Sequence, residues 1–168
     1  YLYKTYGVGG ELRWALAGRN QAKLEAVRTD LIAAGGTTVE LIVVDSMDQA
    51  AMNALAARTT VVCTTVGPYA LYGTPLVAAC VAHGTHYCDL TGEVQWMHRV
   101  INEYQTAAEA SGARIVHTCG FDSIPSDLGA FYVQAQMHAR HGVYAQQVKY
   151  RVVKAEGGMS GGTVASMM

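Results

Sequence analysis

Residues 12–20, LRWALAGRN, predict a buried β-strand that ends in Gly18-Arg19-Asn20. In an α/β nucleotide-binding sheet, the residue just past the second strand meets the adenosine ribose. A carboxylate there accepts hydrogen bonds from a free 2′-hydroxyl, whereas a guanidinium matches the charge and planar geometry of a 2′-phosphate. Arg19 stands at this position, and no Asp or Glu follows within the turn. The sequence therefore predicts binding of NADP(H) rather than NAD.

Outward from this stretch, predicted strands and helices alternate with short connections, which is typical of a parallel sheet covered on both faces. Apolar and β-branched runs predict strands at Leu12–Ala17, Val39–Val44, Thr60–Val66, Tyr87–Leu90 and Arg114–Cys119. Helical spacing and caps predict helices at Gln21–Ala34, Gln49–Ala57, Thr74–His83, Val94–Ala110 and Ser126–Ala139. Alternation over Gln147–Lys154 predicts an antiparallel or edge strand. The expected fold class is α/β, a Rossmann-like doubly wound parallel sheet.

Length and composition indicate an ordinary globular domain. The chain has 168 residues, 51% of them hydrophobic and 15% charged, enough for one sizeable core. A net charge of −1 gives no electrostatic reason to expect nucleic acid. The apolar runs are too short for a membrane-spanning helix, and no signal peptide is recognisable. Four scattered cysteines without a Cys-x-x-Cys pair suit a reducing compartment, so the cytoplasm is the expected location.

Ligands of an open parallel sheet bind beyond the carboxyl ends of its strands, so the loops that follow strands are the candidate sites. The first is Gly18-Arg19-Asn20. The second is Asp45, whose carboxylate suits either the adenine edge or a turn or helix cap. The third is Val66-Gly67-Pro68-Tyr69, where glycine lets the backbone approach a cofactor and proline fixes the turn. Tyr69 and Tyr72 offer rings or hydroxyls to the ribose or nicotinamide, although a plain structural turn is the alternative.

The fourth loop, Gly120–Asp127 (GFDSIPSD), connects a predicted strand to a predicted helix. Ser126 suits a helix N-cap and Asp127 suits the positive end of the helix dipole. Phe121, Asp122 and Ser123 are not needed for the helix, and they stand where a substrate or the nicotinamide carboxamide would lie. We expect these three residues to face the substrate.

Other signals carry less weight. Tyr150 and Lys154 have the spacing of the catalytic pair of short-chain dehydrogenases, but an extended strand would separate them by roughly 13 Å. His83 and His86 lack a third ligand nearby, so no metal site is expected. Glu93 follows a predicted strand, and contact with substrate or capping of the next helix fit it equally well.

The order of these motifs resembles the saccharopine dehydrogenase-like oxidoreductases, a family that includes the trans-acting enoyl reductases of mycobacteria. The stretches that carry the resemblance are WALAGRN (14–20), VGPYALYG (66–73), DLTGE (89–93), GFDSIPSDLG (120–129) and GGMSGGT (157–163). The resemblance extends over essentially the whole chain. It implies an NADP-binding oxidoreductase of about twice this length, in which a second α/β domain holds much of the substrate site. Residues 1–142 would form the NADP-binding domain, and residues 143–168 would begin the second domain.

One part of the family pattern is not found. The family opens with a strand and a Gly-rich turn that holds the pyrophosphate at a helix N-terminus, whereas Tyr1–Gly7 resembles the last turns of that helix. The missing strand would lie in the centre of the sheet, between the strands at Leu12 and Thr60. We therefore expect the 168-residue piece alone to bind NADP poorly.

The expected function is hydride transfer from NADPH to an enoyl or imine-type acceptor, either a small molecule or lipid-linked. Candidate proton donors are Tyr69, Tyr72, Asp122 and His117. A non-catalytic NADP-binding or scaffolding protein is the alternative, because the sequence contains no set of residues that is specific to catalysis and because one fold hosts many functions. A homodimer and association with a membrane are both compatible with the sequence.

Overall fold

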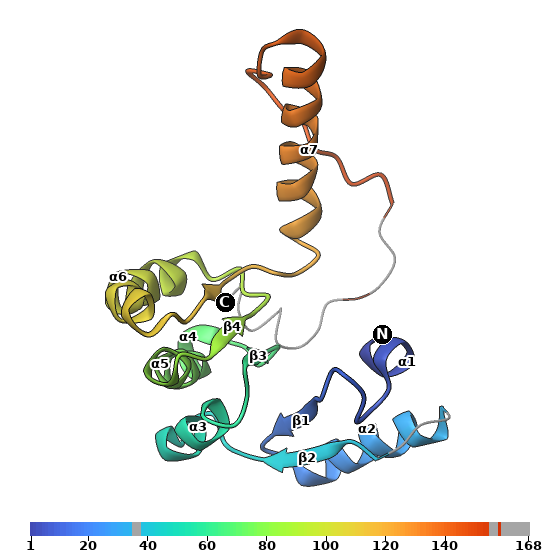
Figure 1. Ribbon diagram of the computed structural model, residues 1–168, viewed down its shortest axis with the longest axis vertical. Helices are drawn as coiled ribbons and strands as arrows, with labels where there is room; N and C mark the ends of the chain where they lie inside the picture. The colour runs from blue at the N-terminus through green and yellow to red at the C-terminus, as the bar shows by residue number, and fades with distance from the viewer. Residues whose placement is uncertain (35–37, 155–157, 159–168) are drawn as a thin grey trace.

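The computed structural model describes residues 1–34, 38–154 and 158. Its strands are parallel and form two sheets (Figure 1). In one sheet, β1 (Ala15–Gly18) pairs with β2 (Glu40–Val43). In the other, β4 (His86–Cys88) lies between β3 (Val61–Cys63) and β5 (Ile115–Val116). The predicted α/β class with parallel strands is confirmed.

Helices connect successive strands, and local caps explain where several of them begin or end. The helices are α1 (Leu2–Tyr6), α2 (Gln21–Ala33), α3 (Gln49–Ala56), α4 (Tyr69–Tyr72), α5 (Thr74–His83), α6 (Val94–Ser111) and α7 (Ile124–His141). Asn20 Oδ1 accepts a hydrogen bond from Lys23 N at 3.0 Å, and Asp48 Oδ1 accepts one from Ala51 N at 3.1 Å. These bonds satisfy free N–H groups in the first turns of α2 and α3. Among the described residues, every helix is too short or too polar to span a bilayer.

The hydrophobic core lies between the sheet of β3, β4 and β5 and the helices α3, α5 and α6, which are stacked along one side of that sheet (Figure 1). Tyr87 of β4, Val77 of α5 and Trp96 of α6 are almost completely buried there. The Thr85 hydroxyl donates to Ala56 O at 2.8 Å, so the start of β4 is tied to the end of α3. This half of the molecule provides the rigid support for the loops beyond β3, β4 and β5.

The remaining elements are less covered. Neither α2 nor α7 contains a buried residue, and α7 points away from both sheets in Figure 1. Phe131 of α7 is 73% exposed. Within the described residues, β1 and β3 belong to different sheets, so the edges on which the family would place its central strand are not hydrogen-bonded to a strand.

Two sequence-based expectations are wrong. Helix α7 begins at Ile124 rather than Ser126, and the Ser126 hydroxyl donates to Ser123 O at 2.8 Å instead of capping the helix. Pro125 accounts for the earlier start, because its fixed φ suits the first helical turn and its missing N–H costs nothing there. Residues 147–154 form no strand, because alternation creates a strand only where another strand offers an edge. Of Gly157–Thr163, only Gly158 lies within the described residues.

The packing of α4 against α6 leads to a prediction. A Cβ added at Gly73 would lie 2.6 Å from Trp96 Cζ2 and 2.9 Å from Tyr69 O. We expect Gly73→Ala to lower the free energy of unfolding by about 1–3 kcal/mol, measured by urea denaturation, because a well-packed core tolerates added volume poorly.

Gly129→Ala is the matched control. Gly129 lies within α7 and a Cβ there meets no atom within 4 Å, so this change is expected to stabilise the helix by about 0.5–1 kcal/mol. Equal effects of the two substitutions would contradict the proposed close contact at Gly73.

Candidate functional site

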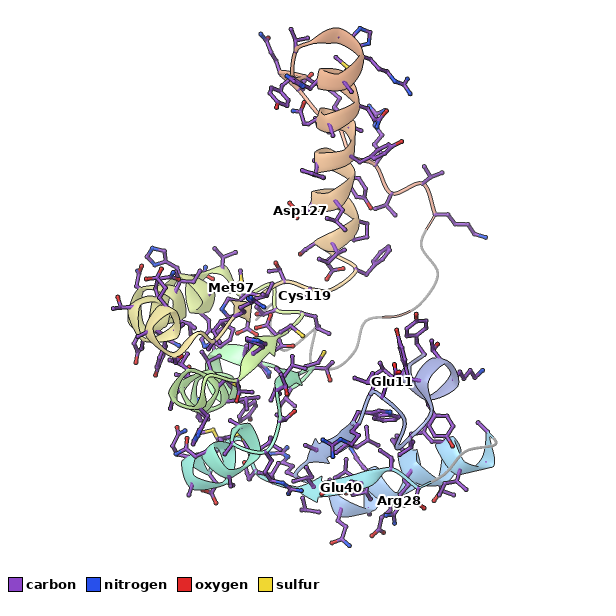
Figure 2. The ribbon with its side chains drawn as sticks, in the orientation of Figure 1. Glu11, Arg28, Glu40, Met97, Cys119 and Asp127 are labelled. Carbon is purple, nitrogen blue, oxygen red and sulfur yellow. The ribbon has the colours of Figure 1, made fainter. Side chains whose placement is uncertain are left out.

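Three loops meet at the carboxyl edge of the sheet formed by β3, β4 and β5. They carry the motifs VGPYALYG after β3, DLTGE after β4 and GFDSIPSDLG after β5. Cys119 marks the third loop in Figure 2, close to the end of β4. Because the strands are parallel and adjacent, residues distant in the sequence converge at this edge.

Asp89, directly after β4, is the centre of the hydrogen bonding at this edge. Its Oδ1 accepts from Thr91 N at 3.1 Å and from Thr118 N at 3.0 Å. Its Oδ2 accepts from the Tyr87 hydroxyl at 2.9 Å and lies 2.7 Å from His117 Nδ1. Burial by itself would raise the pKa of Asp89, but the hydrogen bonds from His117, Thr91 and Tyr87 and the nearby imidazole bring it below its usual value. The carboxylate is therefore the form that this site stabilises.

The loop after β5 has a strained backbone. Thr118 has φ of 60°, a left-handed conformation that is rare for a β-branched residue, and such strain costs about 1–3 kcal/mol. Two N–H groups fix this turn, since Thr118 N donates to Asp89 Oδ1 and Cys119 N donates to Asp89 O at 2.7 Å. A Cβ on Gly120 would lie 2.9 Å from Leu90 Cβ, so only glycine fits between the two loops.

Glu93 ties the loop after β4 to the loop after β3. Its Oε1 accepts from Tyr69 N and its Oε2 from Ala70 N, both at 2.7 Å. The sequence suggested substrate contact or capping of the following helix, but the carboxylate makes no capping bond to α6 and instead holds the first turn of α4. The motif DLTGE showed that an acidic residue stands here, but the partner lies in another loop and was not recognised.

Tyr69 is a buried packing residue, only 4% exposed. Its hydroxyl donates to Thr64 O at 3.2 Å and accepts from Leu90 N at 3.4 Å, while its ring centroid lies 5.6 Å from that of Trp96. Burial raises the pKa of this hydroxyl. This geometry does not favour the candidate role of Tyr69 as a proton donor, because both hydrogen-bonding directions of the hydroxyl are used within the protein.

The other residues of this loop, Val66, Gly67 and Pro68, are exposed or half-buried at the same edge. Their predicted contact with the cofactor stays a prediction.

In the loop after β5, Phe121 is 68% exposed and Asp122 is also exposed, whereas Ser123 is half-buried at the start of α7. The loop thus presents the predicted substrate-facing residues to solvent, and their role likewise stays a prediction.

His117 follows β5, and its side chain is 8% exposed. Its ring lies edge-to-face against Trp96, with ring centroids 5.1 Å apart. Nδ1 faces Asp89, and Nε2 is buried with no hydrogen-bond partner in the described part of the chain. A proton donor has to reach the substrate, so the burial of Nε2 weighs against that candidate role for His117.

A hollow of about 320 Å³ lies at the turn between β1 and α2. Its lining residues are Gly18, Arg19, Asn20, Lys23, Leu24 and Val27. Arg19 is exposed, and no carboxylate of the described residues forms an ion pair with it. Asn20 serves as the cap of α2, and Lys23, which sequence reasoning missed, adds a second cation in the first turn of that helix. Two cations beside a helix N-terminus suit an anion such as a phosphate.

Asp45 lies after β2, and its Oδ1 accepts from Met47 N at 2.9 Å. The structure thus gives this carboxylate the turn role that the sequence left open, and contact with adenine stays a prediction.

No group of His, Cys, Asp and Glu suited to hold a metal ion occurs among residues 1–34, 38–154 and 158.

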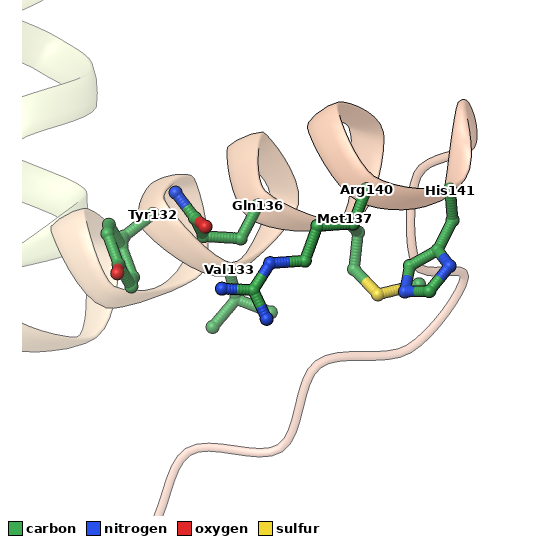
Figure 3. A pocket seen from close by; sticks show the side chains of 6 residues that line it. All are labelled: Tyr132, Val133, Gln136, Met137, Arg140 and His141. Carbon is green, nitrogen blue, oxygen red and sulfur yellow. The ribbon is translucent and has the colours of Figure 1, made fainter.

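A second hollow, of about 280 Å³, runs along α7 (Figure 3). Its lining residues are Tyr132, Val133, Gln136, Met137, Arg140 and His141. All six come from one helix, and none is a predicted site residue. This surface is therefore separate from the edge at which the motif loops meet.

The chain is similar in sequence to mycobacterial proteins that are named as enoyl reductases. A Mycobacterium tuberculosis protein whose name includes trans-acting enoyl reductase is 47% identical over 163 residues, covering 95% of this chain and 38% of that protein. A trans-acting enoyl reductase of Mycobacterium leprae is 44% identical over 142 residues, covering 77% of this chain and 34% of that protein. The chain thus spans well under half the length of these relatives.

The fold is shared with a solved structure. Apo saccharopine dehydrogenase (L-Glu forming) from Saccharomyces cerevisiae matches with a TM-score of 0.67 at 17% identity, over 82% of this chain and 28% of that one. The model of the saccharopine dehydrogenase NADP binding domain matches residues 5–116, which include the Arg19 turn and Asp89 and end just before His117. The chain belongs to the family of the saccharopine dehydrogenase NADP-binding domain.

Proposed function

We propose that this chain is the NADP-binding part of a longer NADP-dependent oxidoreductase that reduces an enoyl-type double bond on a small-molecule or lipid-linked acceptor. The enoyl acceptor is favoured over an imine because the relatives at 44–47% identity are named enoyl reductases. The saccharopine dehydrogenase is only 17% identical and supports the fold alone.

The observation that carries this proposal is the cationic turn at the carboxyl end of β1. Arg19 is exposed, has no ion-pair partner among the described residues and shares its hollow with Lys23. A guanidinium binds a phosphate through two parallel N–H bonds, and the ammonium adds a second positive charge. These residues fit the 2′-phosphate of NADP and offer no carboxylate for the free ribose of NAD.

The bound cofactor would supply the hydride, and this chain would position the reactants. Arg19 and Lys23 would hold the 2′-phosphate. The loops containing Val66–Tyr69 and Phe121–Ser123 would border the nicotinamide and the acceptor at the edge of β3, β4 and β5. Of the four candidate proton donors, Asp122 is the one whose side chain is exposed, so it is the best placed to reach the acceptor.

The reaction can be tested with the full-length protein. We expect NADPH oxidation, followed by loss of absorbance at the nicotinamide band, with enoyl thioesters and not with imines. Turnover of imines alone would contradict the enoyl assignment. NADPH binding without turnover of any acceptor would favour the non-catalytic alternative.

The cofactor preference is tested by Arg19→Ala. Removing the guanidinium should weaken NADPH binding by about 10- to 100-fold, the range for hydrogen bonds to charged groups, and leave NADH binding nearly unchanged. Fluorescence titration of the full-length protein measures both dissociation constants. Arg13→Ala is the matched control, since Arg13 is also exposed but precedes β1 at the opposite end of the strand. Equal losses for NADPH and NADH would exclude the 2′-phosphate assignment.

The isolated 168-residue chain should bind NADPH much more weakly than the full-length protein. The described residues contain no Gly-rich turn between a strand and a helix N-terminus, of the type that holds a pyrophosphate, and they provide no strand between β1 and β3. Fluorescence titration of the two proteins side by side measures the difference. Micromolar binding by the isolated chain would show that the phosphate contacts at Arg19 and Lys23 are sufficient.

A further inference from the structure

We propose that Asp89 is a positioning residue, which together with His117 holds the loop after β5 in the conformation that presents Phe121, Asp122 and Ser123 to the acceptor. This inference rests on the proposed function for the identity of the acceptor, but its structural part is independent of it. It concerns a buried carboxylate that contacts none of the residues predicted to bind the cofactor or face the substrate, although it contacts His117, one of the candidate proton donors.

The first support is the distribution of the Asp89 hydrogen bonds over two loops. Oδ1 accepts from Thr91 N in its own loop and from Thr118 N in the loop after β5. The backbone O of Asp89 accepts from Cys119 N at 2.7 Å. A single residue thus binds two consecutive N–H groups of the neighbouring loop, which fixes its direction as it leaves the strand.

The second support is the conformation that these bonds maintain. Thr118 has φ of 60°, which a β-branched residue adopts only where the surrounding structure compels it. Gly120 lies so close to Leu90 that a Cβ would approach Leu90 Cβ to 2.9 Å. The loop is therefore held by hydrogen bonds at Thr118 and Cys119 and by direct packing at Gly120.

The third support is the short path from this anchor to the exposed residues. Gly120 O accepts from Ser123 N at 3.2 Å and from Ile124 N at 3.0 Å, which forms the turn that carries Phe121 and Asp122 and begins α7. A change in the direction of the chain at Thr118 is passed directly to that turn. The positions of Phe121 and Asp122 thus depend on the carboxylate of Asp89.

His117 completes the pair by fixing the side chain of Asp89. Its Nδ1 lies 2.7 Å from Oδ2, while its ring is packed between Trp96 and Tyr87, with centroid distances of 5.1 and 5.9 Å. Because a carboxylate only accepts hydrogen bonds, Nδ1 is the donor here. The held imidazole directs Oδ2 toward the core and leaves Oδ1 to the two loop N–H groups. In catalytic triads, an aspartate and a histidine orient one another by the same kind of hydrogen bond.

The test compares Asp89→Ala, Asp89→Asn and Tyr87→Phe in the full-length protein. In D89A we expect the Thr91 and Thr118 amides to exchange hydrogen at least about tenfold faster. The value of kcat/KM for the acceptor should fall by about 100-fold, as for a misplacement of about 1 Å. The dissociation constant of NADPH should change by less than about threefold, because Arg19, which would hold the 2′-phosphate, follows a strand of the other sheet.

D89N is the conservative variant that should restore function. Its amide oxygen still accepts from Thr91 N and Thr118 N, so kcat/KM should return to within about tenfold of the wild type. Y87F is the matched control, because it removes a donor to Oδ2 and leaves both loop bonds intact. It should leave amide exchange in the loop and the kcat/KM for the acceptor close to the wild-type values.

Gly120→Ala tests the same loop if D89A does not fold. This change keeps Asp89 but forces the loop away from Leu90, and it should lower kcat/KM for the acceptor while leaving NADPH affinity unchanged. The proposal is overturned if D89A keeps the wild-type kcat/KM and amide exchange. If D89A does not fold, the same result in G120A overturns it. It is also overturned if D89N or Y87F is as impaired as D89A.

The failure of the proposed function is recognisable separately. If the wild-type protein turns over no acceptor, the oxidoreductase assignment fails. The exchange rates of the Thr91 and Thr118 amides in D89A, D89N and Y87F still decide whether Asp89 positions the loop, because they require no substrate. Unchanged exchange in D89A would then overturn the positioning role by itself.

Discussion

The buried carboxylate of Asp89 is the constraint on which the functional edge of this domain depends. It accepts four hydrogen bonds, two from backbone N–H groups and two from side chains. A charge that is only 2% exposed is costly to desolvate, and it is tolerated here because each oxygen has two donors. The same bonds bring the pKa of Asp89 below its usual value despite the opposing effect of burial. The hydrogen bonds of this one side chain therefore connect the loops after β4 and β5.

Glu93 extends this arrangement to a third loop. Its two oxygens bind the N–H groups of Tyr69 and Ala70 at the start of α4. Tyr69 in turn packs on Trp96, whose indole Nε1 donates to the Thr74 hydroxyl at 3.0 Å. The loops after β3, β4 and β5 are thus held together by two acidic residues of the DLTGE motif and by an aromatic contact beneath them. This scaffold leaves Phe121 and Asp122 exposed at the edge where the proposed acceptor would bind.

The two halves of the molecule contribute differently. The half that contains β3, β4 and β5 has a continuous core with α3, α5 and α6, and it supports the tied loops. The half that contains β1 and β2 has little buried surface but carries the cationic turn of Arg19 and Lys23. In the proposed enzyme the first half would position the acceptor and the nicotinamide, and the second would select the cofactor by its phosphate.

The amino-acid sequence by itself determined the elements and their order, because helix caps, helical spacing and apolar runs are local properties. Asn20 and Asp48 cap α2 and α3 through bonds to N–H groups three residues further along, and the parallel α/β class follows from the alternation of the elements. The sequence also placed the motif loops after strands, and hence at one edge of a sheet. Its errors were local signals without a partner, such as the alternation at residues 147–154, with which none of the described strands pairs.

Only the tertiary structure decided which side chains of these loops meet. His117 lies 28 residues from Asp89, and Glu93 lies 24 residues from Tyr69, so no pattern within one segment announces either contact. Burial also gave Tyr69 a packing role, with its hydroxyl bonded to Thr64 O and Leu90 N, while its role as proton donor stays a prediction. The physical reason is that hydrogen bonds and desolvation depend on distances in space, which the order of residues along the chain does not contain.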